Sequence, residues 1–313
     1  MAGVPLVTGA TGFAGRYLVE RLLSGGGSVS AWAHRGGTAA AAAAGVNWHA
    51  VDLLDRDAVR DAVAAARPSV VYHCAGFADV HDAWRAPARA LRVNAVGTHN
   101  LLEAVRQAGL SCRVLVTGSA MVYRPSAQSL TEDSPIGPSG PYGVSKLAQE
   151  MTADASPLPV LIVRPFNHAG PGQSPAYATS AFAQQVAEIE AGWRQAILRV
   201  GNLDARRDIT DVRDTVRAYE ALAERGRPHL PYNVCSGRPR RMRDLLDILL
   251  SLAHVRVRIE LDESRLRPSD NPVIAGSHER LTRDTGWEPE IPIEQTLSDL
   301  LDHWRLATAG QRS

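Results

Sequence analysis

A tyrosine and a lysine stand four residues apart in the segment Tyr142-Gly-Val-Ser-Lys146. On a helix this spacing places both side chains on one face. An ammonium group beside a phenol is expected to lower the phenol's pKa, and such a phenol can exchange a proton with a substrate oxygen near neutral pH. Ser119, after a predicted strand, can donate a hydrogen bond to the same oxygen. Taken alone, the tyrosine and lysine could equally be surface residues of a helix.

Lys146 is the single lysine among 34 basic residues, and the others are arginines. A chain rich in alanine, arginine and glycine tends to use arginine wherever either cation serves. A guanidinium differs from an ammonium in shape and in how readily its pKa shifts. The retained lysine therefore supports a site at this position.

A glycine-rich turn, Gly9-Ala-Thr-Gly12-Phe-Ala-Gly15, follows a predicted strand at 4–8 and opens a predicted helix at 16–23. Glycines let the backbone approach a pyrophosphate, and the helix N-terminus offers free N–H groups to it. The spacing is GxxGxxG rather than GxGxxG. We expect a dinucleotide to contact Gly9, Thr11, Gly12, Phe13, Ala14 and Gly15.

The residues that close the second strand are Ala33-His34-Arg35-Gly36, without an acid. An acid there usually binds the ribose 2′-hydroxyl, whereas a guanidinium suits a 2′-phosphate. His34 and Arg35 therefore favour NADP(H), with NAD(H) as the alternative if Arg35 is only a solvated charge. Further contacts are expected where the next two strands end, from Asp52, Leu53, Cys74, Ala75 and Gly76.

The elements that must position these residues alternate along the first half of the chain. Apolar runs at 4–8, 29–33, 46–51, 69–74, 113–117 and 159–164 predict strands, and the spacing at 16–23, 55–66, 86–108 and 142–155 predicts helices. Residues 38–45, with six alanines, are expected to form a short helix or a surface loop. Alternating strands and helices predict βαβ units and a doubly wound parallel sheet of the Rossmann type in an α/β protein.

After Pro165 the pattern changes, because proline, glycine and arginine become frequent. Predicted helices at 179–191, 212–225, 242–253 and 294–306 are separated by irregular stretches. We expect a dinucleotide-binding domain at 1–165, to which segments near 205–235 return. Residues 166–313 are expected to form mainly a smaller C-terminal α/β substrate-binding domain, which would place a cleft over the carboxyl ends of the strands.

Composition narrows the classes of function. The 313 residues are 45% hydrophobic and carry a formal charge of +1, which argues against a nucleic-acid-binding protein. The sequence shows neither an apolar run long enough to span a bilayer nor a secretory signal. Cys74, Cys112 and Cys235 lie too far apart for a metal cluster and suggest a reducing cytoplasm.

With these motifs in place, the sequence resembles the extended short-chain dehydrogenases/reductases that act on nucleotide sugars. The resemblance covers nearly the whole chain, through GATGFAG at 9–15, NAVGTHNLLEA at 94–104, VTGSAMVY at 116–123, PYGVSK at 141–146, YNVCSG at 232–237 and TGWEPEIPIEQTL at 285–297. RPFNHAGPGQ at 164–173, VGNLDARRD at 200–208 and LRPSD at 266–270 look most like the GDP-4-keto-6-deoxy-mannose reductase group, which is related to GDP-mannose 4,6-dehydratase.

The resemblance implies a catalytic triad of Ser119, Tyr142 and Lys146, with Lys146 also holding the nicotinamide ribose. Asn167 would contact the sugar or its phosphate, and Arg207 and Arg267 would hold the diphosphate of a nucleotide-diphosphate sugar, most plausibly GDP-linked. Thr117, Tyr142, Lys146, Pro165 and Asn167 complete the expected cofactor contacts. The resemblance also implies a homodimer that pairs the helices near 86–108 and 142–155.

One departure from the family's dehydratases bears on the reaction. Those enzymes place acidic side chains just after the catalytic serine or threonine, whereas this chain has Ala120 and Met121. Reduction of a 4-keto sugar needs only a hydride and one proton, so an NAD(P)H-dependent reductase is the preferred hypothesis. A 4-epimerase that retains NAD tightly needs no such acid either and stays open. A non-catalytic nucleotide sensor is less consistent with a retained triad.

Overall fold

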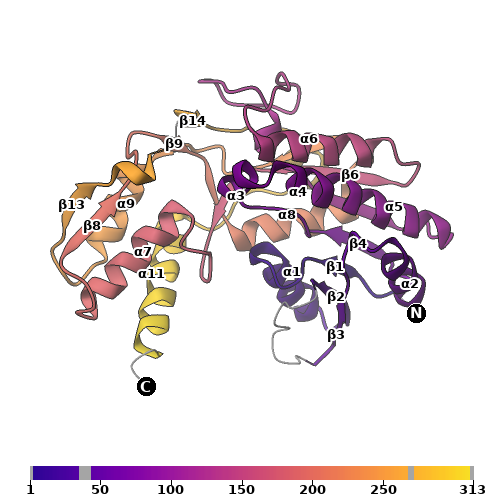
Figure 1. The fold of residues 1–313 in the computed structure, drawn as a ribbon, viewed down its shortest axis with the longest axis horizontal. Helices are drawn as coiled ribbons and strands as arrows, with labels where there is room; N and C mark the ends of the chain where they lie inside the picture. The colour runs from indigo at the N-terminus through magenta and orange to yellow at the C-terminus, as the bar shows by residue number, and fades with distance from the viewer. Residues whose placement is uncertain (1–2, 35–43, 267–270, 311–313) are drawn as a thin grey trace.

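The centre of the molecule is a seven-stranded, all-parallel sheet, and a computed structural model describes residues 3–34, 44–266 and 271–310 (Figure 1). The strand order is β11-β6-β5-β4-β1-β2-β3. In chain order the strands are β1 Leu6–Thr8, β2 Val29–Ala33, β3 Val46–Ala50, β4 Val70–His73, β5 Arg113–Thr117, β6 Val160–Pro165 and β11 Pro231–Val234. The Rossmann-type fold predicted from the alternating pattern is confirmed, and the order reverses at β1 and β4, where such sheets bind ligands.

Helices cover both faces of this sheet. On one face α1 Phe13–Ser24 packs against α8 Val212–Arg225, and α10 Glu279–Thr285 lies beside α8 and β11. On the other face lie α2 Arg56–Ala66, α5 Gly97–Gln107 and α6 Pro141–Asp154. Since both faces are buried, β5 and β6 are continuous apolar runs rather than alternating ones.

Among the helices that differ from their predicted bounds, two bear on the site. Helix α1 begins at Phe13 rather than at 16, because Gly12 serves as its N-cap inside the glycine turn. The predicted helix at 86–108 is a run of three pieces, α4 Pro87–Leu91, a π-helical turn η1 at Arg92–Val96, and α5. Wider turns of this kind occur frequently at functional sites. A short helix, α3 Val80–Arg85, precedes this run.

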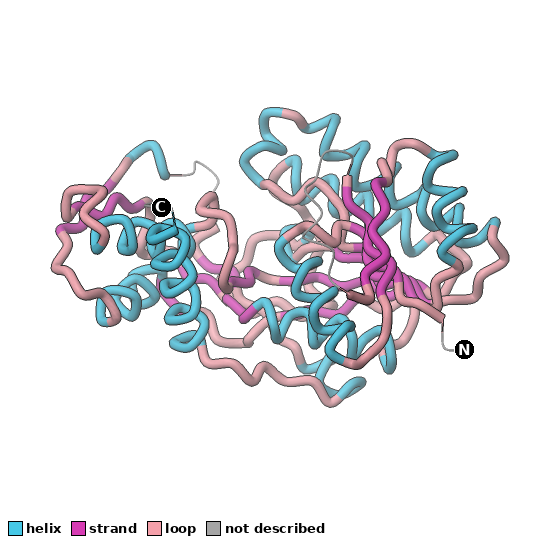
Figure 2. The backbone as a smooth tube through the Cα atoms, turned by 90° about the horizontal axis from the view of Figure 1, so that it is seen from below, coloured by secondary structure: helices cyan, strands magenta, loops and turns pink. Residues whose placement is uncertain are grey.

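The second lobe has its own apolar core and lies at the opposite end of the molecule from the N-terminus (Figures 1 and 2). Its helices are α7 Ala178–Glu190, α9 Met242–Ser251 and α11 Ile293–Gly310, packed on the parallel pair β8 Ile197–Val200 and β13 Arg258–Leu261. The expected helix at 212–225, by contrast, packs on the large sheet as α8. In the part of the chain that the structure describes, no helix is long and apolar enough to cross a membrane.

Short strands connect the lobes. The parallel pair β7 Asn167–Ala169 and β10 Ile209–Asp211 follows directly on β6, and a three-stranded sheet joins β12 Arg240–Arg241, β9 Arg206–Arg207 and β14 Val273–Ile274. Two 3-10 turns, η2 Ala120–Val122 and η3 Glu263–Arg265, complete the described elements. Two of these strands, β9 and β12, consist entirely of arginines.

Candidate active site

The glycine turn after β1 is built for close backbone contact. Gly9 has a φ of +66°, and a Cβ there would lie 2.6 Å from the backbone nitrogen of Ala75. A Cβ at Gly15 would lie 2.1 Å from the carbonyl oxygen of Gly9. Gly12 caps α1 without a side-chain hydrogen bond, so the first N–H groups of the helix face outward. This turn fits a pyrophosphate on the helix N-terminus.

The other predicted cofactor contacts lie along the same edge, at the carboxyl ends of the strands. His34 is exposed after β2, whereas Arg35 and the alanine run up to residue 43 lie outside the described residues. The carboxylate of Asp52 accepts a hydrogen bond of 2.9 Å from the Leu54 N–H, and Leu53 is buried. Thr117 closes β5 and donates a hydrogen bond of 2.9 Å to the His73 carbonyl. Cys74, Ala75 and Gly76 follow β4, and Pro165 ends β6.

Tyr142 and Ser119 lie together at this edge. Their hydroxyls are joined by a hydrogen bond, and the Ser119 hydroxyl also accepts a hydrogen bond of 3.1 Å from the Met121 N–H at the start of η2. Gly143 makes the approach possible, because a Cβ there would lie 2.4 Å from the Met121 carbonyl oxygen. The glycine next to the tyrosine thus lets α6 pack directly on the serine turn.

The pKa of the Tyr142 phenol differs from the expectation, which was a lowered value. Burial raises the pKa of the phenol, and the hydrogen bond with Ser119 only partly opposes that rise. The predicted lowering by Lys146 was therefore wrong for this structure, because the ammonium is directed toward other acceptors and is not among the groups that shift the phenol's pKa. A phenol with a raised pKa stays protonated at neutral pH and can act as a proton donor.

Lys146 lies beneath this pair and is buried, with 5% of the residue exposed. Its Nζ donates hydrogen bonds to the Thr117 carbonyl (2.9 Å) and to Oε1 of Gln149 (2.8 Å). Burial lowers the pKa of Lys146 to about 8, and the nearby Cys74 acts in the opposite direction. The ammonium is thus largely protonated at neutral pH and faces the segment after β4, since a Cβ at Gly76 would lie 3.4 Å from Nζ.

Asn94 belongs to this site but was not singled out from the sequence. It is fully buried in the π-helical turn, and its Oδ1 accepts a hydrogen bond of 2.7 Å from the Phe77 N–H. Its Nδ2 donates to the Ser145 hydroxyl at 2.8 Å. The asparagine thereby joins the segment after β4 to α6. The signal in the sequence is weak, because Thr98 and Asn100 of the same helical run are buried polar residues as well.

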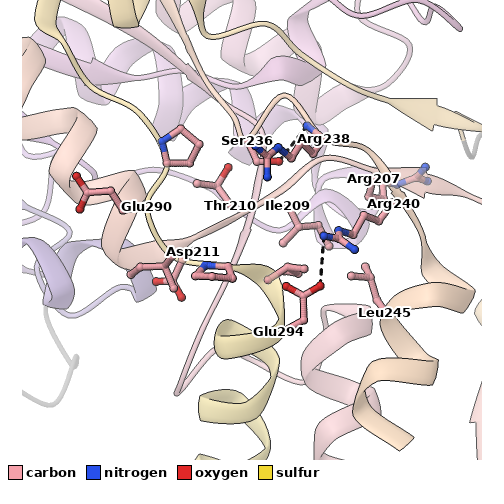
Figure 3. A pocket seen from close by; sticks show the side chains of 14 residues that line it. Arg207, Ile209, Thr210, Asp211, Ser236, Arg238, Arg240, Leu245, Glu290 and Glu294 are labelled. Carbon is pink, nitrogen blue, oxygen red and sulfur yellow. Dashed lines mark hydrogen bonds and ion pairs between the residues drawn. The ribbon is translucent and has the colours of Figure 1, made fainter. Parts of the chain in front are cut away.

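The connection between the lobes holds a cavity of about 150 Å³, which polar and apolar side chains line together (Figure 3). Ile209 and Thr210 of β10 line it, and Ile209 pairs with Asn167 of β7, so the cavity lies one strand from the exposed Asn167. The predicted phosphate contact Arg207 lines the cavity, but Arg267 lies outside the described residues. Arg238, which sequence reasoning missed, is exposed on the lining, and Arg240 pairs with Glu294 at 3.3 Å.

The lining of this cavity holds three arginines and three acids. Each acid of the lining has an arginine partner: Asp211 pairs with Arg213, Glu290 with Arg217 and Glu294 with Arg240. The buried hydroxyl of Thr210 has no hydrogen-bond partner within the described residues and can serve a ligand. Guanidinium groups and hydroxyls are the side chains that bind phosphate oxygens most effectively.

Comparisons with known proteins agree with this geometry. A family model described as GDP-mannose 4,6 dehydratase matches residues 6–300. The chain is 36% identical to the GDP-6-deoxy-D-mannose reductase of Pseudomonas aeruginosa, over 95% of this chain and 96% of that protein. The solved structure of RMD from Pseudomonas aeruginosa complexed with NADPH superposes with a TM-score of 0.84, at 34% identity over 97% of this chain and 100% of the other. The solved structure of the UDP-glucose 4-epimerase of Thermus thermophilus in complex with NAD superposes with a TM-score of 0.84 at 27% identity. The match covers 96% of this chain and 98% of the other.

Proposed function

The chain belongs to the GDP-mannose 4,6 dehydratase family, within the extended short-chain dehydrogenases/reductases, and we propose that it is an NADPH-dependent reductase of a nucleotide-linked 4-keto-6-deoxy sugar. The observation that carries this proposal is a hydrogen-bonded Ser119–Tyr142 pair above a buried lysine, at the edge where the glycine turn lies. The similarity to a GDP-6-deoxy-D-mannose reductase supports the same reaction.

The residues at the sheet edge fit a nicotinamide dinucleotide. Gly9 and Gly15 leave the space that a pyrophosphate needs, since a Cβ at either position would overlap backbone. Lys146 would hold the ribose next to the nicotinamide, and Cys74 to Gly76 would border it. When bound, NADPH supplies the hydride that reduces the C4 carbonyl. A relative bound to NADPH supports the phosphorylated cofactor, in line with the absence of an acid at His34 and Arg35.

In the reduction Tyr142 acts as the proton donor. The C4 carbonyl oxygen would accept hydrogen bonds from Ser119 and Tyr142, whose hydroxyls are already adjacent. As negative charge develops on that oxygen, Tyr142 transfers its proton and Ser119 stabilises the charge by hydrogen bonding. The phenol is protonated at neutral pH, so it enters the reduction as the acid.

Dehydration is disfavoured at this site. Removing water from C5 and C6 of a sugar requires side chains that take one proton and give another. The turn after Ser119 holds Ala120 and Met121, neither of which can exchange protons, and Ala120 is also buried. The chain therefore retains the family's hydride-transfer machinery and lacks the dehydratase's acid.

The cavity of the second lobe would bind the nucleotide diphosphate. Arg207, Arg238 and Arg267 would contact phosphate oxygens, and Asn167 lies on β7, which pairs with the cavity strand β10. The GDP-linked substrate of the similar reductase makes GDP the nucleotide that we propose. The three free cysteines suit the reducing cytoplasm in which such sugars would be processed.

We further propose that the protein is a homodimer. Helix α4 packs on α6, and their outer face exposes Leu91, Val144 and Met151, with 44%, 49% and 65% of the residue accessible. Val144 and Met151 stand seven residues apart, on one side of α6. An apolar face of this kind on two packed helices suits an isologous contact with a second copy.

The reaction is tested by mixing the purified enzyme with NADPH and GDP-4-keto-6-deoxy-mannose. We expect one equivalent of NADPH to be oxidised for each ketosugar consumed. An epimerase, the activity of other relatives, would instead carry firmly bound NAD through purification and show no net oxidation of added NADPH. Failure to oxidise NADPH with any nucleotide-linked 4-keto sugar would reject the proposed reaction.

A further inference from the structure

The ammonium group of Lys146 is directed by two acceptors rather than one. An ammonium has three N–H donors. One N–H donates to the Thr117 carbonyl at 2.9 Å and a second donates to Oε1 of Gln149 at 2.8 Å. These two bonds fix the rotation of the group about its Cε–Nζ bond. Among the described residues the third N–H is the one left for a ligand, and Nζ lies beside Gly76, where a Cβ would come within 3.4 Å of it.

Gln149 is itself fixed by a chain of buried hydrogen bonds. Its Nε2 donates to the Thr98 hydroxyl at 2.9 Å, and the same hydroxyl bonds Nε2 of His73 at 2.8 Å. Nδ1 of His73 bonds the Thr8 hydroxyl at 2.8 Å, which also accepts a bond of 3.2 Å from the Ala75 N–H. Gln149, Thr98 and His73 are fully buried. The chain therefore runs from α6 through α5 to the ends of β4 and β1, where the glycine turn begins.

This chain also determines which end of the Gln149 amide faces the lysine. Rotation of the amide by half a turn would bring its NH2 group against the ammonium and its oxygen against Thr98, which leaves the ammonium one acceptor short. A buried cation that loses an acceptor pays a larger penalty than a neutral donor does. The bond between Gln149 and Thr98 keeps the oxygen directed at Nζ.

We propose that Gln149 is a positioning residue for Lys146: it directs the ammonium toward the cofactor ribose and stabilises its charged form. The proposal rests on the proposed function only in that the ligand of Lys146 is taken to be NADPH. It gives the buried His73 and Thr98 a role in the site as the anchor of Gln149, although neither reaches the cleft.

Few titratable groups face Lys146, so its titration can be interpreted. Cys74 and His73 approach it from β4, and Tyr142 lies one turn away on its own helix. Burial holds the pKa of His73 down at about 3, so this ring stays neutral over the range in which the lysine titrates. Glu150, the next residue along α6, is paired with Arg164.

The single lysine makes a direct experiment possible. Protein labelled with ¹³C-lysine gives one Cε resonance, and its shift against pH reports the pKa of Lys146 alone. The titration is recorded for the wild type, Gln149→Met, Gln149→Glu and Thr98→Val, together with the dissociation constant for NADPH. Gln185→Met is the matched control, because Gln185 is a buried helical glutamine of α7 that bonds backbone groups in the second lobe.

We expect Gln149→Met to lower the pKa of Lys146 by about one unit or more and to weaken NADPH binding about tenfold, as loss of a hydrogen bond to a charged group implies. Gln149→Glu should raise the pKa, because a carboxylate favours the ammonium. Thr98→Val, which frees the amide without removing it, should give a smaller change in the direction of Gln149→Met.

The proposal is overturned if Gln149→Met or Thr98→Val leaves both the Lys146 titration and the NADPH dissociation constant at wild-type values. It is also overturned if Gln185→Met shifts the pKa of Lys146 equally, because the change would then reflect a general loss of packing in the protein. These outcomes are independent of the substrate. A wild-type protein that fails to bind NADPH would reject the proposed cofactor, while the lysine titration would still decide the role of Gln149.

Discussion

The two sides of the cleft are built in opposite ways. The cofactor side consists of backbone turns at the ends of long parallel strands, with its polar groups buried and hydrogen-bonded, as at Lys146, Gln149 and Asn94. The substrate side consists of strands of two or three residues that present partly exposed arginines around a cavity. Tight packing and close backbone contacts fix the groups of the cofactor side, whereas the substrate side depends mainly on the charges of its arginines.

This difference indicates a division of labour. Chemistry requires atoms fixed within a fraction of an ångström, so the reacting groups lie where backbone and buried hydrogen bonds leave little freedom. Recognition of a nucleotide diphosphate requires well-placed charge, which side chains on a short, irregular sheet can supply. Substitutions on the cofactor side should therefore affect turnover or folding, and those on the substrate side should affect KM.

The largest effect is expected at Tyr142. Tyr142→Phe removes the proton donor and should lower kcat by about 10²–10⁴-fold, with little change in NADPH affinity. Steady-state kinetics and a fluorescence titration with NADPH measure the two quantities. Tyr232→Phe is the control, because that hydroxyl bonds Asp284 away from the cleft and its loss should leave kcat unchanged. Full activity in Tyr142→Phe would remove the phenol from the mechanism.

A substitution in the glycine turn should lower both the free energy of unfolding and the affinity for NADPH. In Gly15→Ala the new Cβ would meet the Gly9 carbonyl oxygen at 2.1 Å. Forcing the turn apart should cost about 1–3 kcal/mol of unfolding free energy, as overpacking does. Gly27→Ala is the matched control, because a Cβ there meets open space among the described residues. Urea unfolding with and without NADPH compares the two, and equal stabilities would show that the turn is not tight.

The arginines of the substrate side should affect substrate binding alone. Arg238→Ala and Arg207→Ala are each expected to raise the KM for the nucleotide sugar about 10–100-fold, the range for loss of hydrogen bonds to a charged group. Turnover at saturation and NADPH affinity should change little. Arg60→Ala, on the exposed surface of α2, should have no effect on KM. An unchanged KM in both cavity variants would place the diphosphate elsewhere.

Part of the fold and of the site could be predicted from the sequence, and part could not. Most strands up to β6 were predictable because they lie in apolar runs of five or six residues, and Ser119, Tyr142 and Lys146 follow from motif spacing. The pair β7 and β10 was not predictable, since three-residue strands have no periodicity and Asn167 meets Ile209 only through tertiary pairing. The raised pKa of Tyr142 also depends on burial, which spacing alone does not report.

Gln149 and Asn94 illustrate the same limit. Each is a polar residue inside a helix, and its importance appears only when its partner in space is known: Gln149 reaches Thr98 of α5, and Asn94 reaches Phe77 in the loop after β4. Arg238 was one arginine among many, and only the cavity distinguishes it. Sequence spacing identifies groups on one element, whereas contacts between distant elements require the fold.

The last effect concerns the buried network and pH. Burial lowers the pKa of His73 from its usual 6.5 to about 3, so between these values the unfolded chain binds a proton that the folded protein does not. The free energy of unfolding should therefore fall as the pH drops from 6.5 toward 3, with a contribution from His73 of up to about 1.4 kcal/mol per pH unit. Denaturant unfolding across this range should show a shallower slope for His73→Gln, and identical slopes would contradict a neutral, buried ring.

The reaction itself is tested most directly by following the hydride. The enzyme is supplied with NADPH deuterated at the transferable position of the nicotinamide and with GDP-4-keto-6-deoxy-mannose, and the product sugar is examined by mass spectrometry and NMR. A single deuterium at C4, with one equivalent of oxidised cofactor, is the predicted result. A product that carries no label, or a ketosugar returned unchanged while the enzyme binds NADPH, would contradict reduction at C4.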